Sequence, residues 1–382
     1  MFNSLSNRAK NIKPSAIRRF FAVPDDVISL GIGEPDFDSP ECVQTAAIDA
    51  LSSGKTHYTA NSGLMELRQA VSDDLYARYN VRYDPNTEII MTVGCSEALF
   101  LALAALIDPG DEVVVITPCF VSYQAAVQLA SGISVEVACK FENDFDLDIE
   151  AVAAAITPKT KAILLGFPCN PTGAVASRQK LQELTDLAVK HNLALVTDEL
   201  YDQLVYGVEH VCVPGLEGSF ERTILVGGFS KNFAMTGFRI GFLAAPAPIM
   251  DGAYKIHQYL IMSAPTIAQY GALAAIQHGQ DDVIRMRTEY DRRRHLVVDG
   301  LRSIGLDTVE PKGAFYVFPK ISETGLSSEE FAVKLLEQKK VALIPGNGFG
   351  KGGEGFVRIS YATAYEKIEQ ALDRIDDFVK KL

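Results

Sequence analysis

The sequence predicts an α/β fold, with a large domain around a mostly parallel seven-stranded sheet and a second, smaller α+β domain. The first observation behind this prediction is a set of seven short apolar runs, rich in β-branched residues, between residues 88 and 244. Continuous apolar runs are typical of strands that are buried on both faces of a parallel sheet. The second observation is that helical patterns separate these runs, as in layered α/β proteins.

Seven strands and two clear helices can be placed in the large domain. The predicted strands are Glu88–Val93, Glu112–Ile116, Val135–Ala138, Ala162–Leu165, Ala194–Thr197, Thr223–Val226 and Ile240–Ala244. The clearest helical patterns between them are Ser96–Leu106 and Ser177–His191. The alternation of strands and helices ends near residue 275, which we take as the end of this domain.

A different pattern follows, beginning with a long charged helix. This helix contains the basic run Arg285–Arg294, which we interpret as a solvated helix face because acidic residues such as Glu289 and Asp291 interleave with the arginines. The elements expected after it are a strand at Phe315–Phe318, a helix near Ser327–Glu337, the segment Val341–Ile344, a strand at Phe356–Ser360 and a final helix from about Ala364.

The N-terminal segment is expected to pack with these later elements, which makes the small domain discontinuous. We therefore assign residues 45–275 to the large domain and residues 1–44 and 276–382 to the small one. The first twenty residues, MFNSLSNRAKNIKPSAIRRF, lack the apolar core of a secretory signal and are interpreted as an amphipathic lead-in helix.

The composition argues against several functional classes. The 382 residues carry a formal net charge of −12, which disfavours nucleic-acid binding because phosphate contacts need a basic face. The six cysteines form no CxxC pair, so we expect reduced, buried thiols in a cytoplasmic protein and no metal site. No apolar run reaches the ~20 residues that a membrane-spanning helix needs.

Residues at the carboxyl ends of the strands are candidates for a functional site, because ligands bind there in open α/β sheets. Gly94-Cys95-Ser96 follows the first strand and leads into a helix, whose free backbone N–H groups favour an anion. The alternative is that Ser96 only caps this helix. Phe120 follows the second strand, where it is either a platform for a stacked ring or a core residue.

The next candidates follow the fourth and fifth strands. Asn170 lies in the turn GFPCNPTG, whose prolines and glycines fix the backbone, and the Asn170–Pro171 bond is a candidate for cis geometry. An ordinary β-turn is the alternative. Asp198 and Tyr201 follow the fifth strand. A carboxylate at the end of a buried strand needs a cationic partner or a strong donor, unless it simply caps a helix.

The stretch GGFSKNFAMTGFRIGF follows the sixth strand and contains two charged residues, Lys231 and Arg239. A lysine in these apolar surroundings is partly desolvated, which lowers its pKa and makes it nucleophilic. The alternative is a lysine that reaches solvent along its aliphatic stem. Taken together, an anion cradle, an aromatic ring, an asparagine, an aspartate, a tyrosine, a lysine and an arginine at successive strand ends are what a pyridoxal 5′-phosphate site needs.

These motifs resemble those of the class I aminotransferases, which are fold-type I pyridoxal-phosphate enzymes. The resemblance rests on SKNFAMTGFRIG, PCNPTG, VTDELYDQLVY and GFVRISYA, and it extends over nearly the whole chain. The segments LGIGEPDFDSP, HYTANSGLMELRQAV and ITPCFVSY are similar to the prokaryotic and archaeal branch of aspartate and aromatic aminotransferases. The resemblance therefore implies the fold-type I fold, pyridoxal phosphate as cofactor, and amino acid and 2-oxo acid substrates.

The resemblance also implies roles for individual residues around the ring of the cofactor. Lys231 is expected to form the Schiff base and, once released, to act as the base at the substrate Cα. Asp198 is expected to pair with the pyridine nitrogen. Tyr201 and Asn170 are expected to hydrogen-bond the ring oxygen O3′, and Phe120 to stack on the ring.

Further roles concern the phosphate and the substrate. The residues expected around the phosphate are Gly94, Cys95, Ser96, Ser230, Arg239 and, from a neighbouring subunit, Tyr58. The use of Tyr58 from a second chain implies a homodimer with shared active sites. Arg358 is expected to clamp the substrate α-carboxylate, a bidentate task suited to a guanidinium. The backbone of Ile32–Gly33 is expected to close over the substrate.

Two positions depart from the family pattern, and one motif is misleading. Gly228 stands three residues before the lysine, where some relatives carry a phosphate-binding serine; Ser230 is expected to compensate. Phe120 stands where many relatives stack a tryptophan or tyrosine. Gly348–Gly353 fits G-x-G-x-x-G, but a strand is expected after it, so we interpret it as the loop that delivers Arg358 and not as a dinucleotide site.

We therefore expect an aminotransferase that moves the amino group of an amino acid, aromatic in our first hypothesis, to 2-oxoglutarate by a ping-pong mechanism. Aspartate, alanine or a diaminopimelate derivative are alternative amino donors, and a β-lyase or decarboxylase is the alternative reaction on the same fold. A non-enzymatic regulator is disfavoured because Lys231, Asp198 and Arg358 are all present. A nicotinamide dehydrogenase has only the glycine-rich loop in its favour.

Overall fold

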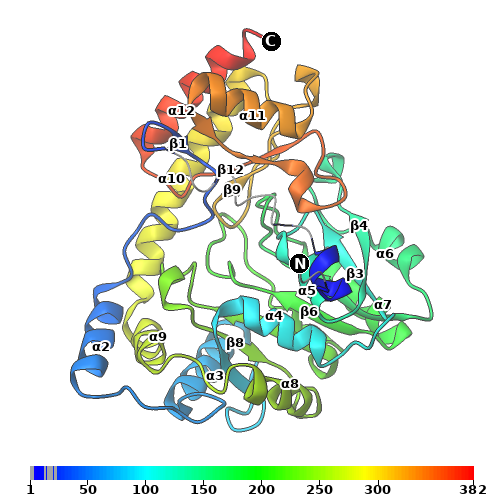
Figure 1. The fold of residues 1–382 in the computed structure, drawn as a ribbon, viewed down its shortest axis with the longest axis vertical. Helices are drawn as coiled ribbons and strands as arrows, with labels where there is room; N and C mark the ends of the chain where they lie inside the picture. The colour runs from blue at the N-terminus through cyan, green and yellow to red at the C-terminus, as the bar shows by residue number, and fades with distance from the viewer. Residues whose placement is uncertain (1–3, 13, 15–19, 21–23) are drawn as a thin grey trace.

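The protein folds into two bodies, shown in Figure 1. The computed structural model describes residues 4–12, 14, 20 and 24–382. The lower body in this view holds a seven-stranded sheet flanked by helices, and the upper body holds short strands with helices packed around them. This arrangement confirms the α/β fold with a second α+β part that the sequence predicts.

The large sheet has the strand order β2-β8-β7-β6-β5-β3-β4. Its strands are β2 (Ile89–Thr92), β3 (Glu112–Thr117), β4 (Ile133–Ala138), β5 (Thr160–Leu165), β6 (Ala194–Asp198), β7 (Thr223–Gly228) and β8 (Gly241–Ala244). Strands β7, β6, β5, β3 and β4 are parallel, whereas β8 runs antiparallel to both of its neighbours. All seven predicted strands are confirmed to within two residues at each end.

Both faces of this sheet are buried, which explains why its strands are continuous apolar runs. In β3, for example, Val113 and Val115 belong to a hydrophobic cluster with helices on one face, while Val114 and Ile116 belong to a cluster with helices on the other. The first face is covered by α4 (Gly94–Ala104), α5 (Ser122–Leu129) and α8 (Ala247–Leu260), and the second by α6 (Ile149–Ala155) and α7 (Arg178–His191).

The remaining helices of the lower body lie at its β2–β8 side. They are α2 (Glu41–Ser52), α3 (Met65–Tyr79) and α9 (Thr266–His278). Apolar residues of all three helices form a third cluster with Met91 of the edge strand β2, with Ala244 of its neighbour β8, and with Ile240, which precedes β8. This cluster closes the end of the sheet at which the strand direction reverses.

The upper body contains two small sheets. In one, β1 (Ile28–Ser29) pairs in parallel with β10 (Val341–Ala342), so the N-terminal segment packs on the C-terminal part as expected. The other is antiparallel and consists of β11 (Ile344–Pro345), β12 (Val357–Ser360) and β9 (Tyr316–Val317). The helices are α10 (Gln280–Ile304), α11 (Ser328–Lys339) and α12 (Tyr365–Val379). The boundaries proposed at residues 44/45 and 275/276 remain a prediction.

The basic run of α10 is not simply a solvated face, so that interpretation was wrong. Arg293 and Arg294 are only 5% and 7% exposed. Arg293 donates to Asp36 at 2.8 Å, and Arg294 donates to Asp291 at 2.8 Å. By contrast, the side chain of Arg285 keeps 60% of its surface exposed. Interleaved acids indicate charge balance along a helix, but they do not indicate which turn of it packs against the N-terminal segment.

Other expectations can also be compared with the structure. Within the described residues, the cis peptide bonds are Thr117–Pro118 and Phe167–Pro168, so the candidate Asn170–Pro171 is a trans bond. All six cysteines are free thiols, with Cys42 and Cys95 partly exposed and the other four buried. In the part of the chain that the structure describes, no helix is long and apolar enough to cross a membrane.

Of the expected lead-in helix, the structure contains α1 (Asn7–Asn11), a helix of five residues. Residues 1–3, 13, 15–19 and 21–23 lie outside the described residues, so most of that prediction has no counterpart here. The chain can be followed without interruption from Pro24 onward, through β1 and into the segment that reaches the candidate site.

Candidate active site

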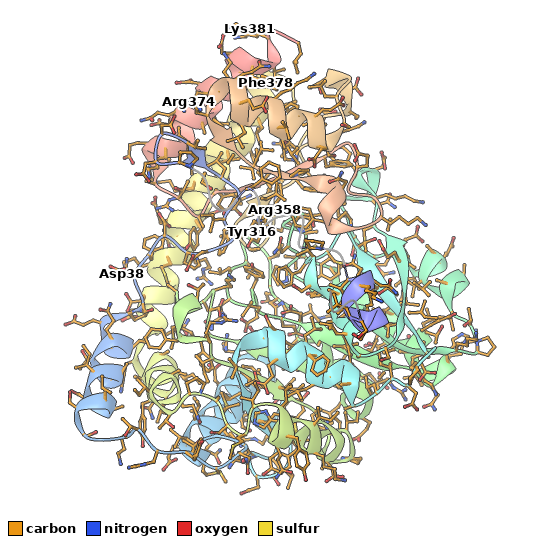
Figure 2. The ribbon with its side chains drawn as sticks, viewed as in Figure 1. Asp38, Tyr316, Arg358, Arg374, Phe378 and Lys381 are labelled. Carbon is orange, nitrogen blue, oxygen red and sulfur yellow. The ribbon has the colours of Figure 1, made fainter. Side chains whose placement is uncertain are left out.

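A cavity of about 520 Å³ lies at the carboxyl ends of β3, β5, β6 and β7. Figure 2 shows Tyr316 and Arg358, which line it, at the level where the upper and lower bodies meet. The predicted site residues that line this cavity are Ile32, Gly33, Cys95, Ser96, Phe120, Asn170, Asp198, Tyr201, Ser230, Lys231, Arg239 and Arg358. The fold therefore brings twelve of the fourteen predicted residues to one place; Gly94 lies directly beside it and Tyr58 does not line it.

Lys231 lies on the turn after β7 and points across the cavity. Its Nζ donates to the backbone carbonyl of Gly33 at 2.6 Å. Burial lowers the pKa of Lys231 to about 8, although Glu34 nearby acts in the opposite direction. The side chain therefore does not reach solvent along its stem, and a substantial fraction of its amine is neutral near physiological pH, as a nucleophile requires.

Asp198 is the last residue of β6. Its carboxylate accepts hydrogen bonds from the Tyr123 hydroxyl at 2.9 Å and from the Leu200 backbone N–H at 3.3 Å. Burial raises the pKa of Asp198 to about 6, against the effect of these donors. A turn and not a helix follows it, so it does not cap a helix. In the described part of the chain no cationic side chain forms an ion pair with this carboxylate, and a cationic ligand group would stabilise its charged form.

Arg358 enters from β12 in the upper body and is 1% exposed. Its Nη1 donates to the Asn170 side-chain oxygen at 2.8 Å and its Nη2 to the Gly31 carbonyl at 2.5 Å. The Nε atom is buried with no hydrogen-bond partner. The guanidinium lies 4.5 Å from the centre of the Tyr316 ring. A buried guanidinium that has no carboxylate partner among the described residues is suited to an anionic ligand.

The start of α4 and Arg239 form an anion cradle. The helix begins at Gly94, so Ser96 lies in its first turn and is not the N-cap, which is Val93. Arg239 donates from Nη1 to the Thr236 carbonyl at 3.0 Å. A Cβ atom at Gly94 would lie 2.7 Å from Arg239 Nη2, which shows how closely the guanidinium approaches the helix start. Free N–H groups and a guanidinium side by side favour a phosphate.

Two tyrosines that the sequence analysis did not predict, Tyr123 and Tyr316, also line the cavity. Tyr201 and Tyr316 are joined through their hydroxyls at 2.8 Å. Tyr123 reaches Asp198, as described above, and its ring meets Phe120 edge-on with centroids 6.0 Å apart. A signal for Tyr316 exists, because Ser360 pairs with Tyr316 in the small sheet and Arg358 lies two residues before Ser360 on the same face. This signal can be used only once the pairing of β9 with β12 is known, so the sequence alone does not supply it.

The departure at Gly228 has a steric explanation. A Cβ atom at this residue would lie 2.7 Å from Cys95 Sγ and 3.2 Å from the Cα of Gly241. The Cys95 thiol itself donates to the Gly227 carbonyl at 3.1 Å. The thiol therefore occupies the space that a side chain at position 228 would need. Ser230, which was expected to compensate, is 6% exposed and lines the cavity.

The loop Gly348–Gly353 is followed by β12 and not by a helix, as expected. It crosses to the lower body, where the Cys119 N–H donates to the Phe349 carbonyl at 3.0 Å and the Lys351 N–H donates to Glu136 at 2.6 Å. These contacts hold the approach to Arg358 in place. The loop thus has a structural explanation that involves no dinucleotide.

The fold and the cavity together define a fold-type I aminotransferase, and comparison with known proteins places the chain. Residues 25–375 match the family model "Aminotransferase class I and II", and the chain belongs to this family. It is 47% identical to an aspartate aminotransferase of Pyrococcus abyssi and 45% identical to aromatic-amino-acid aminotransferase 2 of Thermococcus litoralis, in each case over 99% of both chains.

A solved structure agrees with these sequence comparisons. The aromatic aminotransferase of Pyrococcus horikoshii OT3 superposes with a TM-score of 0.92 at 46% identity, covering 96% of this chain and 99% of that one. Membership of the family makes the protein an aminotransferase (EC 2.6.1.-) that uses pyridoxal phosphate and acts on amino acids and 2-oxo acids. The nicotinamide dehydrogenase and the non-enzymatic regulator are thereby set aside.

The residues of the cavity fit this cofactor. The cradle of Gly94 and Arg239 suits its phosphate, and the unpaired carboxylate of Asp198 suits a protonated pyridine nitrogen. The amine of Lys231, with its pKa lowered to about 8, suits a carbonyl carbon. Arg358, with its buried Nε, is left for an anion of the substrate.

Proposed function

We propose that the protein transfers the amino group of an aromatic amino acid to 2-oxoglutarate, in two half-reactions of a ping-pong cycle. One observation carries this proposal. Lys231 and Arg358 hydrogen-bond to the carbonyls of Gly33 and Gly31, which are two residues apart in one extended segment. A reactive amine and a carboxylate-binding guanidinium at that spacing frame the Cα of one α-amino acid.

Each side chain then has a task that its surroundings explain. When bound, pyridoxal phosphate supplies a carbonyl carbon that takes up the amino group and a ring that takes up an electron pair. Lys231 would hold the cofactor through its amine, and that amine, once free, would take the proton from the substrate Cα and deliver it to the cofactor carbon that has received the amino group. Asp198 keeps the ring nitrogen protonated. Tyr201 and Asn170 hydrogen-bond the ring hydroxyl oxygen.

The phosphate and the ring are held by the large body. Gly94–Ser96 at the start of α4, together with Ser230 and Arg239, binds the phosphate through N–H, hydroxyl and guanidinium donors. Phe120 follows the end of β3 and lines the cavity, where it would cover one face of the ring. These are proposed contacts, supported by the position of every one of these residues in or directly beside the cavity.

The substrate preference is supported by the charges around the cavity. The basic side chains that line it are Lys231, Arg239 and Arg358, and each already has a task. Within the described chain, the lining thus offers no further cation for a second carboxylate of a substrate. Glu34, which also lines the cavity, would repel one. An aromatic side chain against Ile32 and Tyr316 is therefore favoured over aspartate as the amino donor, with alanine and a diaminopimelate derivative as further candidates. The lining does not support 2-oxoglutarate as the acceptor, because its second carboxylate would meet the same residues; that part of the proposal rests on the family resemblance.

Mixing the cofactor-loaded protein with each of the twenty amino acids, with no oxo acid present, tests this proposal. The visible absorbance of the cofactor should change at the lowest concentrations with phenylalanine, tyrosine and tryptophan. Addition of 2-oxoglutarate should then restore the starting spectrum and yield glutamate. A response to aspartate alone would overturn the aromatic preference. Release of pyruvate and ammonia would instead identify a β-lyase.

A homodimer with shared sites is the second part of the proposal. Tyr58 is 80% exposed and does not line the cavity of its own chain. Nearby, Asn61 donates to the Met262 carbonyl at 2.7 Å and Thr266 donates to the His57 carbonyl at 2.7 Å, which joins this segment to the turn after α8. The end of α8 and that turn also expose apolar side chains, namely Tyr259, Leu260, Ile261 and Met262. Such a patch close to the segment of Tyr58 is suited to a second copy of the chain.

A further inference from the structure

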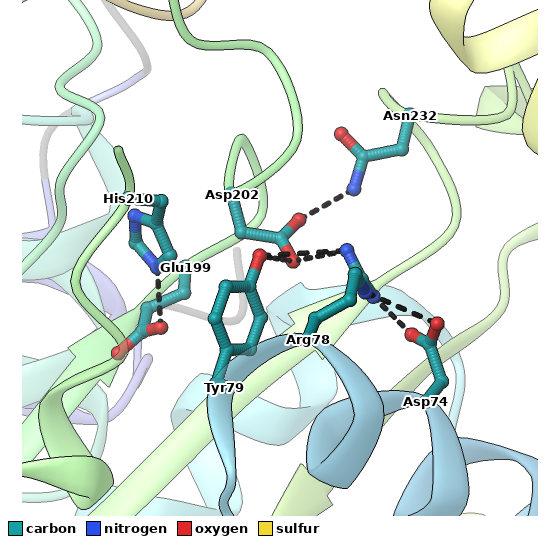
Figure 3. Close-up of polar contacts among 7 residues, drawn as sticks. All are labelled: Asp74, Arg78, Tyr79, Glu199, Asp202, His210 and Asn232. Carbon is teal, nitrogen blue, oxygen red and sulfur yellow. Dashed lines mark hydrogen bonds and ion pairs between the residues drawn. The ribbon is translucent and has the colours of Figure 1, made fainter. Parts of the chain in front are cut away.

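Asp202 is the centre of a polar cluster outside the cavity, drawn in Figure 3. Its Oδ2 accepts hydrogen bonds from Arg78 Nη1 at 2.9 Å and from the Tyr79 hydroxyl at 2.8 Å. Its Oδ1 accepts from Asn232 Nδ2 at 2.6 Å. The carboxylate therefore accepts hydrogen bonds from three donors, which come from two different parts of the chain.

The position of this cluster in the chain gives it its significance. Asp202 directly follows Tyr201, and Asn232 directly follows Lys231. These residues lie on the turns after β6 and β7, which are neighbouring parallel strands whose ladder ends with Asp198 opposite Val226. Beyond that point the hydrogen bond between Asp202 and Asn232 joins the two turns directly, side chain to side chain.

The C-terminal end of helix α3 also holds the cluster in place. Arg78 and Tyr79 are the last two residues of α3, and Arg78 pairs with Asp74 one turn earlier as well as with Asp202. The side chain of Asp202 is 12% exposed and Asn232 is 3% exposed. A buried hydrogen bond to a carboxylate of this kind fixes its partners strongly, because either group would be costly to leave unpaired.

We propose that Asp202 and Asn232 are positioning residues, whose hydrogen bond sets the distance between the Tyr201 hydroxyl and the Lys231 amine. The inference rests on the proposed roles of Lys231 and Tyr201. Neither Asp202 nor Asn232 lines the catalytic cavity, so both act through their neighbours. A displacement of about 1 Å between catalytic groups can lower a rate by about 100-fold, which is the scale of the expected effect.

Asn232→Leu tests this inference, because it removes the bond between the turns and leaves Arg78 and Tyr79 on Asp202. Tyr79→Phe is the matched control, because it removes another hydrogen bond of the same carboxylate and leaves the bond between the turns. For Asn232→Leu we expect kcat to fall about 10- to 100-fold with KM within about threefold. The pH midpoint of the visible band of the bound cofactor, recorded without substrate, should shift by more than about 0.5 unit. For Tyr79→Phe, kcat and the pH midpoint should both stay near their wild-type values.

Two results would overturn the inference: an Asn232→Leu protein with wild-type kcat and pH midpoint, or a Tyr79→Phe protein with the same losses, which would indicate packing alone. If Asn232→Leu does not fold, the smaller Asn232→Ala carries the same expectation. The spectral titration needs no amino acid, so it remains decisive even if the proposed substrate is wrong. Failure of the wild-type protein to react with any amino acid would instead count against the proposed function.

Discussion

Cys95 and Gly228 form a pair in which one residue determines what the other can be. The thiol of Cys95 lies 2.7 Å from where a Cβ at residue 228 would stand. We predict that Gly228→Ser weakens cofactor binding about tenfold, because overpacking costs about 1–3 kcal/mol. The double variant Cys95→Ala/Gly228→Ser should bind the cofactor at least as tightly as Cys95→Ala alone. Dissociation constants from equilibrium dialysis measure both, and equal losses in the single and double variants would contradict the steric explanation.

Arg358 offers a sharper test of substrate binding. Its two Nη atoms are held by Asn170 and Gly31, which leaves a rigid, buried fork. We predict that Arg358→Lys raises KM for the amino acid about 10- to 100-fold, because an ammonium cannot reproduce the bidentate geometry. The affinity for the cofactor alone should change little. Steady-state kinetics and a cofactor titration separate the two, and an unchanged KM would show that the carboxylate binds elsewhere.

Lys231 should leave a signature in the pH dependence of stability. Its folded pKa of about 8 lies below the ordinary value of 10.5, so between these values the unfolded chain binds more protons than the folded one. The lysine therefore costs stability at neutral pH, and this cost disappears as the pH rises from 8 to 10.5. We predict that cofactor-free Lys231→Met is more stable than wild type at pH 7 by on the order of 2 kcal/mol. Urea unfolding across this range should show the difference shrinking; a constant difference would contradict a buried charged amine.

At this scale, the sequence reveals residues whose chemistry is unusual for their surroundings. Lys231 and Asp198 could be predicted because a charged side chain at the end of a buried apolar strand is costly unless a ligand or an opposite charge pairs with it. Tyr123 and Tyr316 could not, since a tyrosine in an apolar segment resembles any core aromatic. Only the fold shows that one reaches Asp198 and the other lies over Arg358. Gly228 was noticed as a departure, but its cause, the thiol of Cys95, lies on a different strand connection.

Among the elements, the strands of the large sheet were the most predictable. Burial on both faces imposes continuous apolar runs, and β3 illustrates this by sending alternate valines into two different clusters. The strands of the upper body are only two to four residues long and too short to carry such a pattern alone, yet β9 and β12 were found because of the aromatic and apolar residues around them. Helix α10 was predicted correctly, but the prediction that its arginines all face solvent was wrong. Arg293 pairs with Asp36, which is 257 residues away in the sequence, and such a distant contact leaves no local pattern.

Helix α10 therefore supplies a prediction at the scale of elements. Arg293 pairs with Asp36 and Glu289 while its guanidinium lies 5.3 Å from the ring centre of Phe37, so it fastens the N-terminal segment to the helix. We expect Arg293→Ala to lower the free energy of unfolding by about 2–4 kcal/mol, because it leaves the partly buried carboxylate of Asp36 without its partner, while Glu289 keeps Arg292. Arg285→Ala, at an exposed pair of the same helix, should cost less than about 1 kcal/mol. Urea unfolding of the two variants makes the comparison, and equal losses would show that Arg293 is an ordinary surface residue.

The whole molecule places the proposed catalytic groups on two bodies. Asp198 ends β6 and Lys231 follows β7 of the large sheet, whereas Arg358 and Tyr316 come from the small antiparallel sheet above it. The cavity exists only where the two meet. This division explains why the sequence could indicate the chemistry of each group and not their spacing, which depends on how the bodies pack.

The proposed dimer is tested at this scale by mixing two impaired chains. In a heterodimer of Tyr58→Phe with Lys231→Ala, one site keeps its own Lys231 and borrows an intact Tyr58 from its partner. We predict that unfolding and refolding the two together restores about a quarter of wild-type activity, because half of the dimers are mixed and each has one intact site. Each homodimer refolded alone is the control. No recovery on mixing would mean that each chain uses its own Tyr58.

The segment Gly31–Gly33 has one more consequence. Its two carbonyls already receive the hydrogen bonds of Arg358 and Lys231, so the chain carries an internal stand-in for the substrate. An arriving carboxylate does not meet an idle guanidinium: at Arg358 it exchanges with the Gly31 carbonyl, whereas the amine of Lys231 leaves the Gly33 carbonyl when the cofactor binds. The measured affinity for the amino acid therefore reflects a competition between its carboxylate and the Gly31 carbonyl for Arg358. Substitutions of those residues in 24–40 that do not line the cavity, but that change how firmly this segment is held, should alter KM without contact with the substrate.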